Sequence, residues 1–346
     1  MRKFLVYCSH GIEDIVIEEV RQLKPEAIVE PFFEIQGRLV IRNITLDQLR
    51  QLHSIYTIIE LKQDIAEFDK TSNGIYEAIK QLEIPELKTA SSFRVSSRRY
   101  GQHDFTSNDL QAMAGKALQE NYQTPVSLKE YQYNIRIDVI AKYYFAGIEH
   151  EDKRLEQRFD RTYFHRAGLK PSMAYALLQL ADIQDGDTVV DPFAGGGTLP
   201  LEAAGLYGSK IQNISGDLYS EEVAKAQENA ALNNLDELIE FRAINVYRME
   251  DFVTEPVDKI ISNPPYGVKS ATKSNIRKLY RVMLIKAATV LKDHGKMVLL
   301  MQRTDMFREL VLRTKLFKIC HERVIEANSL HPHVFVLGKV DDHDME

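Results

Sequence analysis

The sequence is poor in cysteine, lacks tryptophan and has no long hydrophobic run. Among its 346 residues, Cys8 and Cys320 are the two cysteines, and they lie far apart without a CxxC pair or a nearby histidine in metal-ligand spacing. This argues against a disulfide framework and a zinc site, so we expect two buried thiols and no bound metal. No stretch reaches the ~18 apolar residues of a membrane span, and the N-terminus turns polar too early for a signal peptide. These absences predict a soluble, cytoplasmic protein with no membrane partner.

The charge balance gives little global attraction to nucleic acid. The formal net charge is -6 at pH 7, with 44 Lys and Arg against 50 Asp and Glu. A polyanion would therefore be bound through local basic patches, which a global sum can hide. The length corresponds to two or three domains, each able to bury its own core.

Two small α+β units are predicted in the first half of the chain. In residues 1–60, short β-like runs at 4–7 and 38–41 alternate with amphipathic helical stretches at 13–23 and 46–52. In residues 61–150, the patterns predict strands at 93–97 and 135–140, with a helix at 107–121 that has a serine N-cap. Residues 151–170 are arginine-dense and lack a clean period, and they predict a linker.

From residue 171 onward, strand and helix patterns alternate regularly. This alternation is typical of a parallel sheet with crossover helices, so we expect residues 171–346 to form a doubly wound α/β domain. The expected helices cover a segment opened by Lys170-Pro171-Ser172, then 198–207, 220–234 and 276–291. The expected strands are 188–190, 211–216, 239–243, 259–262, 297–301 and 334–337.

A glycine-rich turn follows the first strand of that domain. It reads Asp191-Pro192-Phe193-Ala194-Gly195-Gly196-Gly197-Thr198. Glycines let the backbone approach a ligand closely and leave amide hydrogens free at a helix N-terminus, although a purely structural turn can have the same composition. Neither the GxGxxG dinucleotide fingerprint nor the GxxxxGK[ST] phosphate loop is present. The pattern favours a nucleoside-like ligand without a polyphosphate, and it disfavours a nicotinamide oxidoreductase.

Polar residues also end the next two strands. Asp217, followed by Leu218, lies about twenty residues after the glycine turn, where a carboxylate can accept hydrogen bonds from both hydroxyls of a ribose. The alternative is that Asp217 only solvates a strand end. Asn245, followed by Val246, can hydrogen-bond an adenine edge, and a purely structural role is almost as well supported.

The most specific pattern is Asn263-Pro264-Pro265-Tyr266, at the end of the fourth strand. Two successive prolines fix φ and donate no hydrogen bond, so they make a stiff turn whose carbonyls act as acceptors. The Asn263 amide oxygen and the Pro264 carbonyl can accept two hydrogen bonds from one exocyclic amino group. The ring of Tyr266 offers a surface on which a base can stack.

These motifs resemble the class I S-adenosylmethionine-dependent methyltransferases that modify exocyclic amino nitrogens. The glycine turn is similar to their cofactor loop, Asn263-Pro264-Pro265-Tyr266 to their catalytic motif, and Lys170-Pro171-Ser172 to the helix start that contacts the methionine part of the cofactor. Phe93-Arg94-Val95, Arg98-Arg99 and the segment from Gly101 to Ser107, which includes His103, resemble a THUMP RNA-binding domain preceded by a ferredoxin-like segment.

The combination resembles the THUMP-containing RNA guanine-N2 methyltransferases, most closely those that modify guanosine 6 in the tRNA acceptor stem. The resemblance implies S-adenosylmethionine as cofactor and tRNA as partner, with a monomeric enzyme. The tRNA guanine-10 enzymes rank second because they usually carry Asp where this chain has Asn263. A 23S rRNA guanine-N2 enzyme is a further alternative. Family members commonly have an acidic residue at the adenine contact. This chain has Asn245 there, so it departs from the family pattern at that position.

The implied sites fall into three groups. The catalytic residues are Asn263, Pro264, Pro265 and Tyr266. The cofactor residues are Lys170, Pro171, Ser172, Asp191, Pro192, Phe193, Ala194, Gly195, Gly197, Thr198, Asp217, Leu218, Asn245 and Val246. The RNA-binding residues are Arg94, Arg98, Arg99, His103 and Arg166, although arginines in such clusters are also common on solvated faces.

Two rival functions remain open on the sequence. One is an N6-adenine methyltransferase on DNA or RNA, which uses the same amino-group chemistry. The other is an RNA-binding protein whose methyltransferase domain no longer works. The intact glycine turn and Asn-Pro-Pro-Tyr motif argue against the second. For the favoured reaction, a paired guanine must leave its stack to reach the site, so we expect base flipping.

Overall fold

The computed structural model describes residues 2–33, 35–151, 153–165, 168–267, 273–325 and 331–340. The chain folds as two compact units. The first comprises Met1–Cys8 and Ile17–Asp152, and the second comprises Ser9–Val16 and Lys153–Glu346. Within the described residues, every helix is too short or too polar to cross a lipid bilayer.

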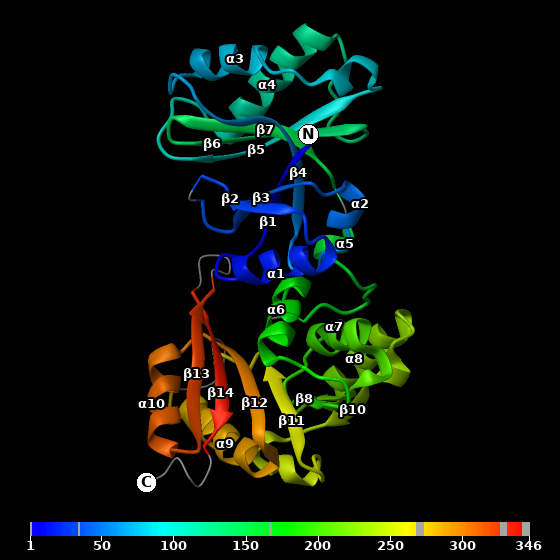
Figure 1. Cartoon of the computed structure of the whole chain (residues 1–346), viewed down its shortest axis with the longest axis vertical. Helices are drawn as coiled ribbons and strands as arrows, with labels where there is room; N and C mark the ends of the chain where they lie inside the picture. The colour runs from blue at the N-terminus through cyan, green and yellow to red at the C-terminus, as the bar shows by residue number, and fades with distance from the viewer. Residues whose placement is uncertain are drawn as a thin grey trace. The chain divides into compact units, whose positions relative to one another are not determined.

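A seven-stranded sheet runs through the first unit in the order β2-β3-β1-β4-β7-β6-β5 (Figure 1). Its strands are β1 (Lys3–Tyr7), β2 (Ile28–Pro31), β3 (Arg38–Arg42), β4 (Thr57–Glu67), β5 (Phe93–Tyr100), β6 (Tyr133–Ile140) and β7 (Tyr143–Glu149). The expected domain boundary at residue 60 falls inside β4, which pairs with β1 along one edge and with β7 along the other. The ferredoxin-like and THUMP segments therefore share one sheet, which the sequence periodicity did not reveal.

The helices of the N-terminal half are α1 (Glu13–Leu23), α2 (Leu46–Leu49), α3 (Ser72–Lys80) and α4 (Ser107–Tyr122), with a 3-10 turn η1 (Pro85–Thr89). Helices α3 and α4 lie together on one face of the β5–β7 part of the sheet (Figure 1). The N-cap of α4 is Thr106, in a capping box with Asp109, and not the predicted serine. The reason is that Thr106 has the extended φ and ψ of a cap, whereas Ser107 is already helical.

The second unit contains a seven-stranded sheet in the order β10-β9-β8-β11-β12-β14-β13. Its strands are β8 (Thr188–Asp191), β9 (Gln212–Asp217), β10 (Glu240–Ala243), β11 (Val257–Ser262), β12 (Leu291–Met301), β13 (Phe317–Val324) and β14 (His333–Lys339). The first five strands in this order pair in parallel, as predicted for a doubly wound domain. Strands β14 and β13 are antiparallel to their neighbours.

The helices of the second unit are α5 (Lys153–Glu156), α6 (Pro171–Ala181), α7 (Thr198–Tyr207), α8 (Ser220–Leu232), α9 (Lys273–Val290) and α10 (Thr304–Thr314), with short 3-10 turns η2 (Gly208–Lys210), η3 (Asp236–Leu238) and η4 (Val246–Asp251). Met297, Leu299 and Met301 of β12 pack into one core with α9 and α10. The intervening Val298 and Leu300 are also buried, because the opposite face of the sheet is covered. Burial on both faces explains the continuous apolar runs of these strands.

The C-terminal edge of this sheet corrects one prediction. Strand β13 and helix α10 were not expected from the sequence, and Cys320 lies on β13 with its thiol exposed, whereas Cys8 is buried as predicted. Because β13 is the edge strand and only one of its faces meets the core, alternate side chains along it point to solvent.

Candidate active site

Four neighbouring parallel strands carry the predicted site residues at their carboxyl ends. Strands β8, β9 and β11 end at Asp191, Asp217 and Ser262, and Asn245 lies two residues after β10. Because the strands are parallel, these ends lie along one edge of the sheet, where open α/β sheets bind their ligands. The structure thus brings Asp191, Asp217 and Asn245 to the same edge as the predicted catalytic motif.

Asp191, at the end of β8, is hydrogen-bonded to the end of the neighbouring strand β11. Its side chain is 3% exposed, and its Oδ1 accepts hydrogen bonds from the Phe193 amide at 3.0 Å and from the Ser262 hydroxyl at 2.5 Å. Burial raises the pKa of this carboxyl to about 7. Sequence reasoning missed Ser262, although a polar residue that ends an apolar strand directly before Asn263 was an available signal.

The glycine turn is fastened to β9. The Ala194 amide donates to the Gly216 carbonyl at 2.8 Å, and the Gly195 amide donates to Oδ2 of Asp217 at 3.3 Å. Gly195 and Gly197 have positive φ values of 52° and 84°, which other residues adopt at a cost. Gly197 is the N-cap of α7 and supplies no side-chain cap, so the first turn of α7 directs backbone amides out of its N-terminus.

The ribose and adenine candidates have different surroundings. Asp217 also accepts a hydrogen bond from the Tyr219 amide at 3.3 Å, and burial raises the pKa of its carboxyl. Leu218 beside it is 55% exposed. Asn245 is the N-cap of η4, where its Oδ1 accepts from the Tyr247 amide at 3.0 Å, while Val246 is buried. The Asn245 oxygen therefore has a local role, and its Nδ2 group is the part that can donate to an adenine ring nitrogen.

The Asn-Pro-Pro-Tyr segment is held by hydrogen bonds within itself and from outside. Inside it, the Tyr266 hydroxyl donates to Oδ1 of Asn263. From outside, the Tyr280 hydroxyl of α9 donates to the Pro265 carbonyl at 2.9 Å, and Nε of Arg303 donates to the Tyr266 carbonyl at 3.1 Å. The carbonyls of the second proline and the tyrosine are thus held by the protein itself. Sequence reasoning missed both Tyr280 and Arg303, because they come from distant elements.

Gly267 closes this turn in a conformation that needs glycine. Its φ is 74°, and a Cβ atom there would lie 2.4 Å from Cγ1 of Ile276. The chain therefore passes close to the start of α9 directly after the motif. This close approach stiffens the segment further.

The residues at the start of α6 fit a bound cofactor. Lys170 is the N-cap of α6, Pro171 is its first residue, and the Ser172 hydroxyl is 1% exposed without a hydrogen-bond partner among the described residues. A buried hydroxyl of this kind calls for a polar partner, which a ligand can supply. Together with the backbone amides at the N-terminus of α7 and the carboxylate of Asp217, this donor and acceptor set suits the polar groups of S-adenosylmethionine.

Residues 153–165, the segment before α6, belong to the second unit and pack against α7. Nη1 of Arg161 donates to the Thr198 hydroxyl at 2.7 Å, and Arg158 forms a 3.0 Å ion pair with the fully buried Glu202 of α7. The ring of His165 lies against Gly195, since a Cβ there would be 3.4 Å from its Cγ. Sequence reasoning assigned residues 151–170 to a linker because the stretch has no periodicity.

The predicted RNA-binding residues of the first unit differ in exposure. Arg98 is exposed on β5, whereas Arg94 is half-buried, pairs with Glu151 and lies 4.3 Å from the centre of the Tyr131 ring. Nη1 of Arg99 donates to the Gly101 carbonyl at 2.6 Å and lies 3.1 Å from Nδ1 of His103. Arg99 and half-buried His103 thus stabilise a turn, and Arg98 presents the more accessible charge. The remaining predicted residue, Arg166, lies outside the described residues.

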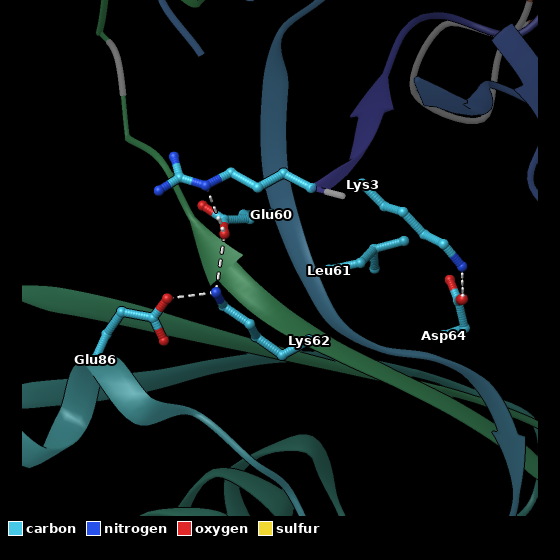
Figure 2. Close-up of a pocket in the computed structure, with 7 residues that line it drawn as sticks. Lys3, Glu60, Leu61, Lys62, Asp64 and Glu86 are labelled. Carbon is cyan, nitrogen blue, oxygen red and sulfur yellow. Dashed lines mark hydrogen bonds and ion pairs between the residues drawn. The ribbon is translucent and has the colours of Figure 1, made fainter. Parts of the chain in front are cut away.

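A polar pocket of about 460 Å³ lies in the first unit (Figure 2). It is lined by Arg2, Lys3, Glu60, Leu61, Lys62, Asp64 and Glu86. Lys62 lies between Glu60 and Glu86 and pairs with both, and Lys3 pairs with Asp64 (Figure 2). Hydrogen bonds from His150 and Lys62 lower the pKa of Glu60 to about 2. Three cations face three carboxylates, so the pocket has no net charge with which to attract a phosphate.

Two family models match this chain. Residues 158–332 match the family described as RMKL-like, methyltransferase domain, and residues 69–146 match the THUMP domain. The chain is 33% identical over 334 residues to a tRNA (guanine(6)-N2)-methyltransferase of Thermus thermophilus, covering 95% of this chain and 97% of that protein. A protein of the same name from Archaeoglobus fulgidus is 25% identical over 96% of this chain and 91% of its own length.

Among solved structures, the crystal structure of TrmN from Thermus thermophilus superposes with a TM-score of 0.84 at 31% identity, over 98% of this chain and 100% of that one. The family match spans strands β8, β9 and β11, which end at Asp191, Asp217 and Ser262. The chain therefore belongs to the RMKL-like methyltransferases that carry a THUMP domain.

Proposed function

We propose that this protein transfers a methyl group from S-adenosylmethionine to the exocyclic N2 of guanosine 6 in the acceptor stem of tRNA. The observation that carries the proposal is the hydrogen bond between Ser262 and Asp191, which joins the strand before the amine-binding motif to the strand before the cofactor loop. The guanine-6 position is supported by the name of the Thermus thermophilus relative, which matches nearly the whole chain.

Bound S-adenosylmethionine supplies an electrophilic methyl group on a sulfonium. The residues that would hold it are Ser172 at the start of α6, the backbone amides at the N-terminus of α7, Asp217 and the Nδ2 group of Asn245. Asp217 is suited to the ribose hydroxyls because its carboxylate is already oriented by two backbone amides. The turn has neither the GxGxxG pattern that binds a pyrophosphate nor the lysine of a phosphate loop, which disfavours a polyphosphate ligand.

The guanine N2 is a weak nucleophile because its lone pair is delocalised into the ring. Oδ1 of Asn263 and the carbonyl of Pro264 accept its two hydrogens, which favours a more tetrahedral nitrogen whose lone pair is directed at the methyl carbon. Fixed acceptors of this kind act by positioning and electrostatics and need no strong base. After transfer, the positively charged nitrogen releases its proton to water.

Tyr266 has two roles in this scheme. Its hydroxyl donates to Oδ1 of Asn263, and because an amide oxygen has two lone pairs, a second hydrogen bond from the guanine amine can be accepted there. The hydroxyl thereby orients the Asn263 amide with its oxygen toward the substrate. Its half-buried ring is the surface on which the flipped base stacks, offsetting a few kcal/mol of unstacking.

The THUMP-containing unit supplies the RNA contacts. An A-form stem is recognised by its shape, 2′-hydroxyls and phosphates more than by base edges. Arg98, exposed on β5, is the best placed of the described candidates for a phosphate contact. We propose that the enzyme acts as a monomer on one tRNA at a time.

The test is methylation of tRNA transcripts in vitro, followed by mass spectrometry of the nucleosides. We expect N2-methylguanosine in a transcript with guanosine at position 6, and none when that base pair is reversed. A product at position 10 would identify the guanine-10 activity, and N6-methyladenosine would identify the adenine activity. Methylation of 23S rRNA fragments in preference to tRNA would overturn the substrate class.

A further inference from the structure

One buried side chain of α8 connects the glycine turn to the segment before α6. Asn229 has no solvent exposure, and its amide makes four hydrogen bonds. Its Oδ1 accepts from the amides of Thr162 and Tyr163 at 3.1 and 3.3 Å, and its Nδ2 donates to the carbonyls of Tyr163 and Gly196 at 2.9 and 3.1 Å. Both acceptor sites and both donor hydrogens of the amide are thus used, so its orientation is fully determined.

The hydrogen bond to Gly196 controls a peptide group of the glycine turn. The carbonyl of the Gly196–Gly197 peptide accepts from Asn229, and its amide hydrogen is donated to the Ala194 carbonyl at 2.9 Å. Because a peptide group is planar, holding both ends fixes its orientation. This peptide directly precedes α7, so its orientation sets the direction of the amides at the N-terminus of that helix.

The same side chain holds the segment that lies over the turn. A Cβ on Gly196 would lie 3.2 Å from the His165 backbone nitrogen and 3.7 Å from Cδ1 of Tyr163. The segment therefore packs closely on the glycine turn, and Asn229 is the one side chain that bonds to both among the hydrogen bonds of the described residues.

We propose that Asn229 is a positioning residue for the cofactor: its amide holds the Gly196–Gly197 peptide, and the segment over it, in the arrangement that receives S-adenosylmethionine. The inference rests on the proposed function only in its choice of ligand. Asn229 acts through Gly196 and is not itself a group that touches the reacting atoms.

A matched control lies one helical turn further on, at the C-cap of α8. Asn233 bonds to the same segment with the same chemistry, because its Oδ1 accepts from the Asp160 amide at 3.0 Å and its Nδ2 donates to the Asp160 carbonyl at 2.9 Å. Its Nδ2 also donates to the backbone carbonyl of Asn229 in α8, at 2.7 Å. Asn233 therefore makes the same kind of hydrogen bonds to the segment before α6 but makes none to the glycine turn among those of the described residues.

The experiment compares Asn229→Asp with Asn233→Asp in the full chain. A carboxylate keeps the acceptor role and loses the donor role, so Asn229→Asp removes the bonds to the Gly196 and Tyr163 carbonyls. Calorimetric titration with S-adenosylmethionine, in the absence of RNA, measures the Kd, and thermal melting measures the loss of stability. We expect Asn229→Asp to raise the Kd roughly tenfold, equivalent to about 1.4 kcal/mol. Asn233→Asp should change it less than twofold.

Several outcomes would overturn the proposal. An unchanged Kd in Asn229→Asp would do so, as would equal changes in both variants, which would indicate a general structural effect. If Asn229→Asp does not fold, Asn229→Ala and Asn233→Ala give the same comparison. If neither Asn229 variant folds while both Asn233 variants do, the amide serves folding and the assigned role is wrong. The titration uses no RNA, so its result does not depend on the guanine-N2 activity. The role of Asn229 can be disproved while that activity is confirmed, and it can be confirmed while that activity is disproved.

Discussion

The hydroxyl of Ser262 donates to Oδ1 of Asp191 across 2.5 Å, although the two residues are 71 positions apart in the sequence. Both side chains are buried, at the ends of the adjacent parallel strands β11 and β8. Asp191 is the first residue of the glycine turn, and Ser262 directly precedes Asn263. A displacement of either loop therefore acts on the other through one hydrogen bond.

Removing that hydrogen bond should lower turnover more than stability alone explains. We expect Ser262→Ala to cost about 1 to 2 kcal/mol of unfolding free energy and to slow methyl transfer about tenfold, because the two loops are no longer held together. Ser215→Ala is the control, since this buried hydroxyl on β9 bonds to Asn213 within its own strand. Urea unfolding and single-turnover kinetics measure the two quantities. Equal kinetic effects in both variants would contradict the coupling.

The titration of Asp191 should make stability depend on pH. Burial raises its pKa from an ordinary value near 3.8 to about 7. Between these values the folded protein holds a proton that the unfolded chain has released, so the free energy of unfolding falls as pH rises from about 4 to about 7. Asp191→Asn removes this dependence. Relative to wild type, the variant should gain up to about 4 kcal/mol across that range, at ~1.4 kcal/mol per pKa unit.

Urea unfolding at several pH values between 4.5 and 7.5 measures this gain. Asp305→Asn is the control for removing one carboxylate, since that side chain is 97% exposed. Parallel profiles for wild type and Asp191→Asn would show that Asp191 does not titrate in this range.

Asn263 should contribute to the reaction and not to cofactor binding. Replacing it by alanine removes an acceptor for the guanine amine, so we expect a loss of roughly 2 to 4 kcal/mol of transition-state stabilisation with a nearly normal Kd for S-adenosylmethionine. Asn275→Ala, at an exposed position of α9, is the control. Unchanged turnover in Asn263→Ala would rule out the assigned role.

Tyr280 should act through the backbone of the catalytic motif. Burial raises its pKa to about 12, so the hydroxyl remains a donor to the Pro265 carbonyl at every working pH. We expect Tyr280→Phe to lower kcat about tenfold with little effect on the KM for RNA, because the motif loses an external support. Tyr144→Phe, a buried tyrosine of the first unit, should leave kcat unchanged. A change confined to KM would contradict this expectation.

Substitutions of Arg98 and Arg99 should have different effects, one on RNA binding and the other on stability. Arg98 is exposed, so Arg98→Gln should weaken tRNA binding and reduce the slope of log K against log salt by about one. Arg99→Gln should mainly lower the melting temperature, since Arg99 holds the turn at Gly101 and His103. Filter binding at several salt concentrations and thermal melting distinguish these effects, and an unaltered salt slope in Arg98→Gln would remove it from the interface.

The sequence alone determined the class of the second unit and the chemistry of its motifs. Helix 13–23 and helix 198–207 were predicted with the bounds found, because amphipathic periodicity and glycine stops are local signals. The carboxyl ends of β8, β9 and β11 could also be assigned, since the parallel order follows from the alternation of strands and helices.

Only the tertiary structure decided how distant residues meet. The bonds from Ser262 to Asp191, from Tyr280 to Pro265 and from Asn229 to Gly196 join residues 71, 15 and 33 positions apart, and no local pattern specifies such pairs. The joining of the ferredoxin-like and THUMP segments through β4 depends likewise on pairing across the sheet. A sequence period records which face of an element is buried, whereas the partner on that face is selected by packing and hydrogen bonding in the complete fold.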